Sequence, residues 1–479
     1  MIGQKHIEIN WKNFVQGMTT SNVTEDGGFS IGVGNGVDSV ATHSIVNPYT
    51  NPGKLAFAAL PIDKSTNATG EIVASCEDVT GDHARLAVSS DDAQHGQCYS
   101  VDGEGTLTTR GDEDTTHGVY QEGRTDITSF DGEFYFTSGS YLRQWALPAT
   151  FDGGAGYPFG FSDIYAYHPV LVYEDTLYIG DGNILLEVTG AGVTPTAVLT
   201  MAANYTIQAL GIDPASGKML ISTQDQYDHT NRYNVQGRVH YYNGYSNTVA
   251  KIVLTNEPIT AFYNMGGTVF VAYGENFGYW TGTGTQFLRR FNLNTPFYKH
   301  SMTNIMDVLY IAAGKRIIAF GEIMQGQGRS WWYPFQNSLP SGSLNTVRFV
   351  VRLLNDIIAF SCGTSKFYTL DTSSTSNIDS DTGNTTWYSK EHNFPKAVTF
   401  NSVTIQYDAN VTASTDIGTL YLIDDTGTEY TLGTVNTAET KLSFDFPYLT
   451  VETRSFQLKY IAKNNTPIER ITIFYTPKE

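Results

Sequence analysis

Pro169-Val-Leu-Val-Tyr-Glu-Asp-Thr-Leu-Tyr-Ile-Gly180 is the clearest copy of a strand pattern that recurs along most of this 479-residue chain. An apolar run leads into the polar pair Glu174-Asp175, and a second apolar run follows and ends at a glycine. Two short apolar runs on either side of a tight polar turn are typical of a β-hairpin. This stretch therefore predicts two antiparallel strands joined by a short turn.

Similar hairpin patterns follow one another at an even spacing. The second strand of each copy begins, in chain order, at Leu86, Phe134, Leu177, Met219, Val269, Leu309 and Ile357. A period of about 40–50 residues with strand signal throughout is typical of the four-stranded blades of a β-propeller. The sequence predicts an all-β fold in which residues 46–372 form a seven-bladed β-propeller. The alternative is a series of unrelated hairpins in stacked sandwiches.

The pattern changes after residue 372. Residues 373–385 are rich in Ser, Thr and Asp, which is typical of a linker, and residues 386–479 show clean period-2 alternation. The alternating residues are Val403/Ile405/Tyr407, Leu420/Leu422, Leu442/Phe444/Phe446, Phe456/Leu458/Tyr460 and Ile471/Ile473/Tyr475. Strands with one buried and one solvated face show this alternation. Residues 386–479 are therefore predicted to form a small antiparallel β-sandwich.

The first 45 residues do not fit the blade pattern. A glycine-rich run, Gly27-Gly-Phe-Ser-Ile-Gly-Val-Gly-Asn-Gly36, follows two isolated apolar residues, Trp11 and Phe14. A segment with so little apolar surface does not fold alone. Residues 1–45 are predicted to form an extended arm that lies over a partner or across the propeller.

Composition excludes several classes of protein. The net charge is −19, which argues against a specific nucleic-acid-binding surface, although it permits a channel through which DNA slides. Three cysteines, Cys76, Cys98 and Cys362, are too few for a disulfide framework and lack metal-ligand spacing, which predicts buried thiols. The sequence shows no signal peptide and no apolar run long enough for a membrane span, so we expect a soluble protein made in a cytoplasm.

No catalytic or cofactor-binding motif stands out, so no catalytic residue, metal ligand or cofactor is predicted. His83, His95 and His117 share one blade-sized stretch with acidic residues from Asp82 to Asp114. These residues could form a metal site, but solvated turn residues are the favoured interpretation, because no pair has a spacing that fixes both on one face. Arg110-Gly-Asp112 is the tripeptide that integrins read, and chance is the favoured explanation for it.

One aromatic cluster could bind sugars. Trp331-Trp-Tyr333 with Phe335 has the flat apolar faces that pack on pyranose rings. The favoured interpretation is that these residues belong to the core of a strand.

Three stretches resemble structural proteins of tailed-bacteriophage virions. Asn47-Pro-Tyr-Thr-Asn-Pro-Gly-Lys-Leu55 is similar to the stretch that opens many β-propeller-like phage tail proteins, and the hairpin at 259–272 resembles their blades. The stretch from Trp387 to Tyr475 resembles their small C-terminal β-domain. Together these stretches span most of the chain, and the glycine-rich arm has no counterpart.

The resemblance implies a non-enzymatic virion component of the tail nozzle, hub or connector type. It further implies other virion proteins as partners and a homo-oligomeric ring, often six-fold. The alternative is a glycan-binding or glycan-depolymerising propeller at a tail tip, for which a host surface glycan would be the partner. A third possibility is a periplasmic or surface scaffold, which the missing signal peptide disfavours.

Overall fold

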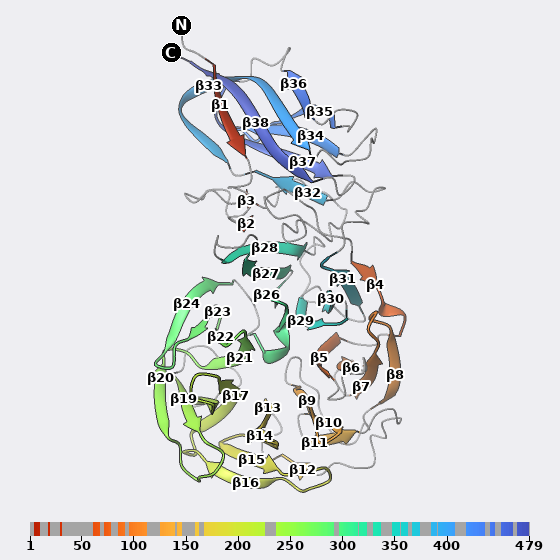
Figure 1. Cartoon of the computed structure of the whole chain (residues 1–479), viewed down its shortest axis with the longest axis vertical. Helices are drawn as coiled ribbons and strands as arrows, with labels where there is room; N and C mark the ends of the chain where they lie inside the picture. The colour runs from red at the N-terminus through yellow and green to blue at the C-terminus, as the bar shows by residue number, and fades with distance from the viewer. Residues whose placement is uncertain are drawn as a thin grey trace. The chain divides into compact units, whose positions relative to one another are not determined.

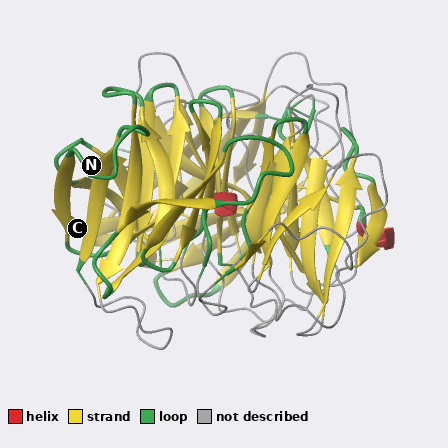
Figure 2. Ribbon diagram, turned by 90° about the horizontal axis from the view of Figure 1, so that it is seen from below, coloured by secondary structure: helices red, strands yellow, loops and turns green. Residues whose placement is uncertain are grey.

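The computed structural model is almost entirely β-structure, with two short 3-10 turns (Figures 1 and 2). It describes residues 4–9, 18–19, 29–30, 61–67, 71–77, 85–91, 95–112, 125–138, 141–145, 159–161, 167–225, 236–291, 297–314, 316–322, 329–336, 347–354, 356–362, 366–373, 385–389, 391–407, 418–435, 441–445, 452–462 and 467–478. Among these residues, no helix is long and apolar enough to cross a membrane.

The chain divides into two compact units. One, here called the propeller unit, comprises Ile62–Gly314 and Ser343–Thr369. The other, here called the terminal unit, comprises Met1–Pro61, Lys315–Gly342 and Leu370–Glu479. The predicted linear order of arm, propeller, linker and sandwich does not follow these units, because segments from three parts of the sequence build the terminal unit.

Six four-stranded sheets of the described chain lie in the propeller unit, apart from the last two residues of strand β31. The first three are β5 (Glu71–Glu77), β6 (Arg85–Asp91), β7 (His95–Val101), β8 (Leu107–Asp112); β9 (Ile127–Phe130), β10 (Glu133–Ser138), β11 (Tyr141–Trp145), β12 (Phe159–Gly160); and β13 (Val170–Tyr173), β14 (Thr176–Asp181), β15 (Ile184–Val188), β16 (Thr196–Thr200). The other three are β17 (Tyr205–Asp213), β18 (Lys218–Asp225), β19 (Gly237–Tyr242), β20 (Lys251–Thr255); β21 (Ile259–Met265), β22 (Thr268–Tyr273), β23 (Asn276–Trp280), β24 (Thr285–Arg290); and β29 (Val347–Arg352), β30 (Ile357–Cys362), β31 (Phe367–Asp371), β4 (Ile62–Asp63).

The first strands of these sheets surround a common centre (Figure 1). Strand β9 lies between β5 and β13, β17 lies between β13 and β21, and β29 lies beside β5. The remaining arc holds the turn η2 (Lys299–Ser301), which lies beside β21, and β25 (Met302–Ile305), which lies beside β29. A circle of radially stacked four-stranded sheets is a β-propeller.

The number of blades is not confirmed as predicted. Strand β25 and β26 (Val308–Ala313) continue in one sheet with β27 (Arg316–Glu322) and β28 (Arg329–Gln336). The division between the two units falls inside this sheet, because β27 and β28 belong to the terminal unit. The propeller therefore has six blades within its own unit, and the seventh stays a prediction.

The predicted hairpins are confirmed. The second strand of each hairpin begins within one residue of the predicted position in all seven cases. Glu174 and Asp175 both have positive φ, 46° and 57°, as do Asp131 and Gly132. Two successive residues in this region form the tight turn whose twist matches that of the flanking strands.

A small residue recurs as the fifth residue of each second strand, and the structure explains it. In the seven hairpins this position holds Ser89, Thr137, Gly180, Ser222, Ala272, Ala312 and Ser361. At Gly180 an added Cβ would lie 2.8 Å from Cγ2 of Ile207, on the first strand of the next blade. The hydroxyls of two of the serines bond to the first strand of the next blade: Ser361 donates to the Ile72 carbonyl at 2.7 Å, and Ser222 accepts from the Ile259 amide at 3.1 Å. The position is therefore where neighbouring blades approach each other.

The N-terminal side of the chain completes the last blade. Strand β4 pairs with β31, and the Lys64 amide donates to the Phe367 carbonyl at 2.8 Å just before the short turn η1 (Ser65–Asn67). The Asp63 carboxylate lies 2.8 Å from Lys366 Nζ. Because β4 comes from the start of the propeller unit and β31 from its end, their pairing closes the ring.

The terminal unit also joins both ends of the chain. Strand β1 (Lys5–Ile9) pairs antiparallel with β38 (Ile468–Pro477), so residues 5–9 of the predicted arm are an edge strand. The period-2 placement of Ile7 and Ile9 is the signal that could have predicted it. The other strands of this sheet are β2 (Met18–Thr19), β3 (Phe29–Ser30), β32 (Thr385–Tyr388), β33 (His392–Tyr407), β34 (Gly418–Asp424), β35 (Glu429–Val435), β36 (Lys441–Asp445) and β37 (Glu452–Ala462).

The predicted alternation of the C-terminal strands is confirmed at Ile405, Leu458 and Ile473, which are fully buried. The predicted β-sandwich is not confirmed, because the described strands form one ten-stranded hydrogen-bonded sheet. Two long strands change partners along their length: β33 pairs with β37, β38 and β36, and β37 pairs with β33, β32 and β34. The predicted linker lies outside the described residues except for residues 373 and 385.

Candidate functional site

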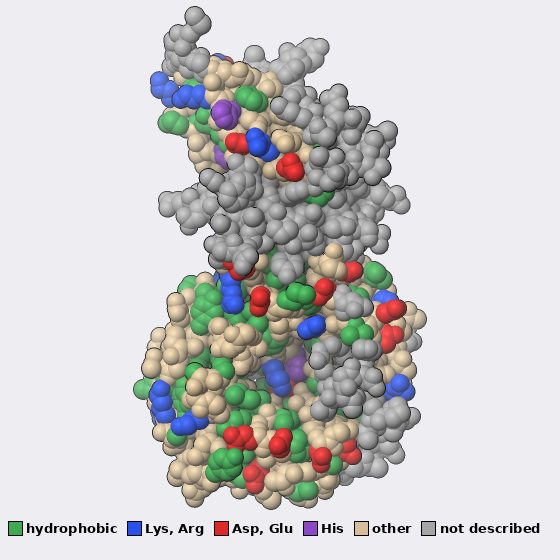
Figure 3. Space-filling model, in the orientation of Figure 1, with side chains coloured by type: hydrophobic (Ala, Val, Ile, Leu, Met, Phe, Trp, Pro, Cys, Tyr) green, Lys and Arg blue, Asp and Glu red, His purple; other side chains and the backbone are tan. Residues whose placement is uncertain are grey.

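A cavity of about 350 Å³ lies at the centre of the propeller unit. Figure 3 shows the corresponding hollow, with a basic and a histidine side chain inside it. The lining residues come from the innermost strands and from η2: Ser75, Cys76, Ile127, Thr128, Phe262, Tyr263, Asn264, Lys299, His300, Met302, Thr303, Val350 and Val351. Six segments of the chain therefore meet at one site.

The turn η2 occupies the middle of the ring. It lies beside β5, β21, β26 and β29, and its side chains reach the residues around β9 and β13. His300 and Ser301 are 8% and 3% exposed. The turn η2 is therefore packed into the centre of the propeller.

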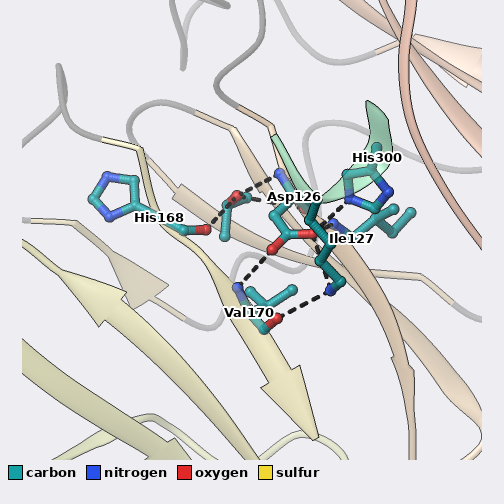
Figure 4. Close-up of polar contacts among 7 residues, drawn as sticks. Asp126, Ile127, His168, Val170 and His300 are labelled. Atoms are coloured by element: carbon teal, nitrogen blue, oxygen red, sulfur yellow. Dashed lines mark hydrogen bonds and ion pairs between the residues drawn. The ribbon is translucent and has the colours of Figure 1, made fainter. Parts of the chain in front are cut away.

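Asp126, immediately before β9, holds η2 in place (Figure 4). Its Oδ1 accepts hydrogen bonds from His300 Nε2 at 2.6 Å and from Lys299 Nζ at 3.3 Å. Its Oδ2 accepts one from the Val170 amide at 2.8 Å. The side chain is almost fully buried, so each oxygen is satisfied by protein and not by water.

The carboxylate of Asp126 stays ionised. Burial alone would raise its pKa, but the charge of Lys299 and the hydrogen bonds from His300 and Val170 hold the pKa well below its usual range. An ionised carboxylate only accepts hydrogen bonds, so His300 Nε2 is the donor. Burial, followed by the nearby charge of Asp126, raises the pKa of the Tyr167 hydroxyl well above its usual value.

The network joins blades that are distant in sequence. The Thr137 hydroxyl donates to the His168 carbonyl at 3.1 Å, and the Thr137 amide donates to the Asp126 carbonyl at 2.9 Å. The His168 ring stacks on Phe161 with ring centres 3.8 Å apart, and its Nδ1 lies 2.9 Å from the Gly180 carbonyl. Asp126 therefore fixes the position of two blades and of η2 together.

None of the candidates singled out from sequence is among the described residues that line the cavity. His83 and His117 lie outside the described residues, and the side chain of His95 is not described. In the described parts of the chain no group of three His, Cys, Asp or Glu residues could hold a metal ion. Arg110-Gly-Asp112 is part of strand β8, and Arg110 Nε donates to the Ser100 hydroxyl at 2.8 Å.

The buried members of the aromatic cluster at 331–335 agree with the favoured interpretation, a strand core, and not with a sugar platform. Trp332 and Phe335 are 0% and 1% exposed, so they belong to a core. Trp331 is half-buried, and its ring centre lies 4.3 Å from that of Phe320. Among the cysteines, Cys98 and Cys362 are buried as predicted, and Cys76 is half-buried at the cavity.

Sequence reasoning missed Asp126, Lys299, His300 and Ser75. Asp126 and His300 are 174 residues apart, and spacing along the chain cannot show that a ring brings them together. A Lys-His pair just before a predicted hairpin is the only local signal, and it is weak.

No protein-family model matches this chain, and no curated protein matches it. Solved structures of propeller proteins are similar in fold. A structure of YCF48 bound to D1 peptide has a TM-score of 0.42 and 12% identity, and covers 65% of this chain and 94% of its own. Hsv2 of Kluyveromyces lactis has a TM-score of 0.36 and 12% identity, and covers 61% of this chain and 90% of its own. The N-terminal domain of Nup159 has a TM-score of 0.41 and 7% identity, and covers 66% of this chain and 95% of its own.

Proposed function

We propose that this chain is a structural component of a tailed-phage virion, in the tail nozzle, hub or connector ring, and that it acts by assembly and not by catalysis. Its partners are further copies of itself in a closed ring and other virion proteins. The three stretches that resemble phage tail proteins support this proposal. The closure of the propeller ring by the pairing of β4 with β31 supports it as well, because a ring closed by its first and last strands does not open from one end.

The observation that carries the proposal is an apolar rim on two neighbouring blades. Ile252 and Leu254 on the outermost strand β20 are 50% and 59% exposed, and Phe287 on the outermost strand β24 is 57% exposed. Figure 1 shows both strands at the outer rim of the propeller. Ile252 and Leu254 are two residues apart on one strand and therefore point to the same face of it, and an exposed apolar surface is typical of a protein–protein interface. We call these three residues the apolar rim.

The proposal extends to the finer features of the fold. Strand β26 carries a small residue, Ala312, at the same position as the other second strands, and β25 lies beside β29. These features support β25–β28 as a seventh blade. The changes of partner along β33 and β37 support a sheet that folds over into the predicted β-sandwich.

Light scattering over a range of protein concentrations tests the assembly role. We expect a discrete closed oligomer, and we expect the triple variant Ile252→Ser, Leu254→Ser, Phe287→Ser to be a folded monomer. Met306→Ser is the matched control, because Met306 is 64% exposed but lies in a hairpin turn away from the rim strands. A wild-type monomer that binds or shortens a bacterial polysaccharide would instead support the glycan alternative.

A further inference from the structure

The central cavity has an apolar and a polar part. Ile127, Phe262, Met302, Val350 and Val351 supply apolar surface. Lys299 and His300 supply nitrogen atoms, and Ser75 and Thr128 supply hydroxyl groups. No Asp or Glu is among the described residues that line the cavity. The charge of Asp126 behind the wall is already engaged by Lys299 and His300.

Ser75 lies in the wall of this cavity, and its hydroxyl lacks a hydrogen-bond partner. Its side chain is 7% exposed, and its Oγ is buried without a hydrogen-bond partner in the described structure. A buried polar group that lacks a partner costs about 1–3 kcal/mol relative to one that is bonded. A change of the Ser75 side-chain rotamer would turn this hydroxyl toward a molecule bound in the cavity, which would supply the missing partner.

The ammonium group of Lys299 can donate one further hydrogen bond. An ammonium group has three N–H donors. Two acceptors are in place, Asp126 Oδ1 at 3.3 Å and the Val170 carbonyl at 3.1 Å. The side chain is 32% exposed, so the third donor is accessible from the cavity.

We propose that the cavity binds a small organic carboxylate with an apolar body. Lys299 and Ser75 bind the two carboxylate oxygens, and the apolar wall packs on the hydrocarbon part. One ammonium and one hydroxyl match a carboxylate, whereas phosphate sites usually gather several N–H donors. The cavity volume lies at the lower end of the range of roughly 300–1,000 Å³ for small-molecule sites. This site goes beyond the assembly role and does not depend on it.

Calorimetric titration with benzoate and its neutral analogue benzamide tests the proposal. We expect benzoate to bind about ten-fold more tightly than benzamide, because only benzoate pairs with the ammonium. Equal binding of the two probes would overturn the proposal, and so would failure of benzoate to bind at millimolar concentrations.

Two serine variants separate binding from folding. Ser75→Ala removes a hydroxyl without a protein partner, so we expect unchanged thermal stability and benzoate binding weakened about five-fold. Ser361→Ala removes the bond to the Ile72 carbonyl outside the cavity, so we expect lower stability and unchanged benzoate binding. Wild-type affinity in Ser75→Ala would contradict the site.

Thiol labelling gives a second readout on the native protein. Cys76 lines the cavity, whereas Cys98 and Cys362 are buried. We expect benzoate, but not benzamide, to slow the alkylation of Cys76. An unchanged rate with saturating benzoate would place any binding elsewhere and overturn the proposal.

Discussion

Asp126 is the residue whose charge we expect to matter most for stability. Its two oxygens accept N–H groups from both sides, so the amide of Asp126→Asn would turn a donor toward a donor in either orientation. It would also leave Lys299 without its counter-charge and weaken the hydrogen bond from the buried His300. We expect the free energy of unfolding, measured in urea, to fall by about 3–5 kcal/mol. The exposed Asp307→Asn is the control and should change it by less than about 0.5 kcal/mol.

His240 makes stability depend on pH. Burial, followed by the charge of Arg238, lowers the pKa of its imidazole to about 4, from the usual 6.5. Between these values the unfolded chain binds a proton that the folded chain does not, so the free energy of unfolding falls as the pH falls through this window. From pH 7 to about pH 5 the expected loss is about 2 kcal/mol from this residue.

The variant His240→Gln isolates that contribution. It lacks the titrating group, so its free energy of unfolding should fall less between pH 7 and pH 5 than that of the wild type. His6→Gln changes an exposed histidine on β1 and should retain the wild-type slope. If the free energy of unfolding falls equally with pH in the wild type and in His240→Gln, His240 is not the origin of the pH dependence.

At the scale of elements, the small residue of each second strand sets the distance between blades. Gly180→Ala places a Cβ 2.8 Å from Ile207 Cγ2 and 3.1 Å from Pro169 Cδ, which forces the next blade to move. We expect a loss of about 1–3 kcal/mol in chemical denaturation. Gly284→Ala is the matched control, because its Cβ meets nothing within 4 Å, and it should be neutral.

The elements were largely predictable, and their assembly was not. Local patterns such as Glu174-Asp175 between two apolar runs predict a hairpin, because the turn and the strands are neighbours in sequence. The pairing of β4 with β31 and of β1 with β38 joins residues more than 300 positions apart. The periodicity of residues along the sequence does not indicate which distant strands pair. The cavity could not be predicted for the same reason, because Ser75 and Lys299 come to line one cavity only when the ring closes.

At the scale of the whole molecule, the terminal unit should hold a cut chain together. Cleavage between residues 373 and 385 separates β1 and β3 from β38 and β32 in sequence, but their pairing within one sheet remains. We expect the two fragments to co-elute in native gel filtration and to separate in denaturant. If residues 386–479 elute alone under native conditions, these strand pairs do not hold the unit together.

The mutation that isolates this effect lies in β1. Ile9 is 4% exposed and pairs with Ile471. Ile9→Asp should release the C-terminal fragment after the same cut, whereas substitution of the exposed His6 by Gln should not.

The central claim is that the chain functions as part of an assembled particle. The most direct measurement is quantitative mass spectrometry of phage particles purified on a density gradient from a culture that encodes the chain. The account predicts peptides of this chain in the particle fraction, at a fixed ratio to the other virion proteins across the gradient. Its absence from the particles, together with its presence in the soluble fraction of the same lysate, would contradict the claim.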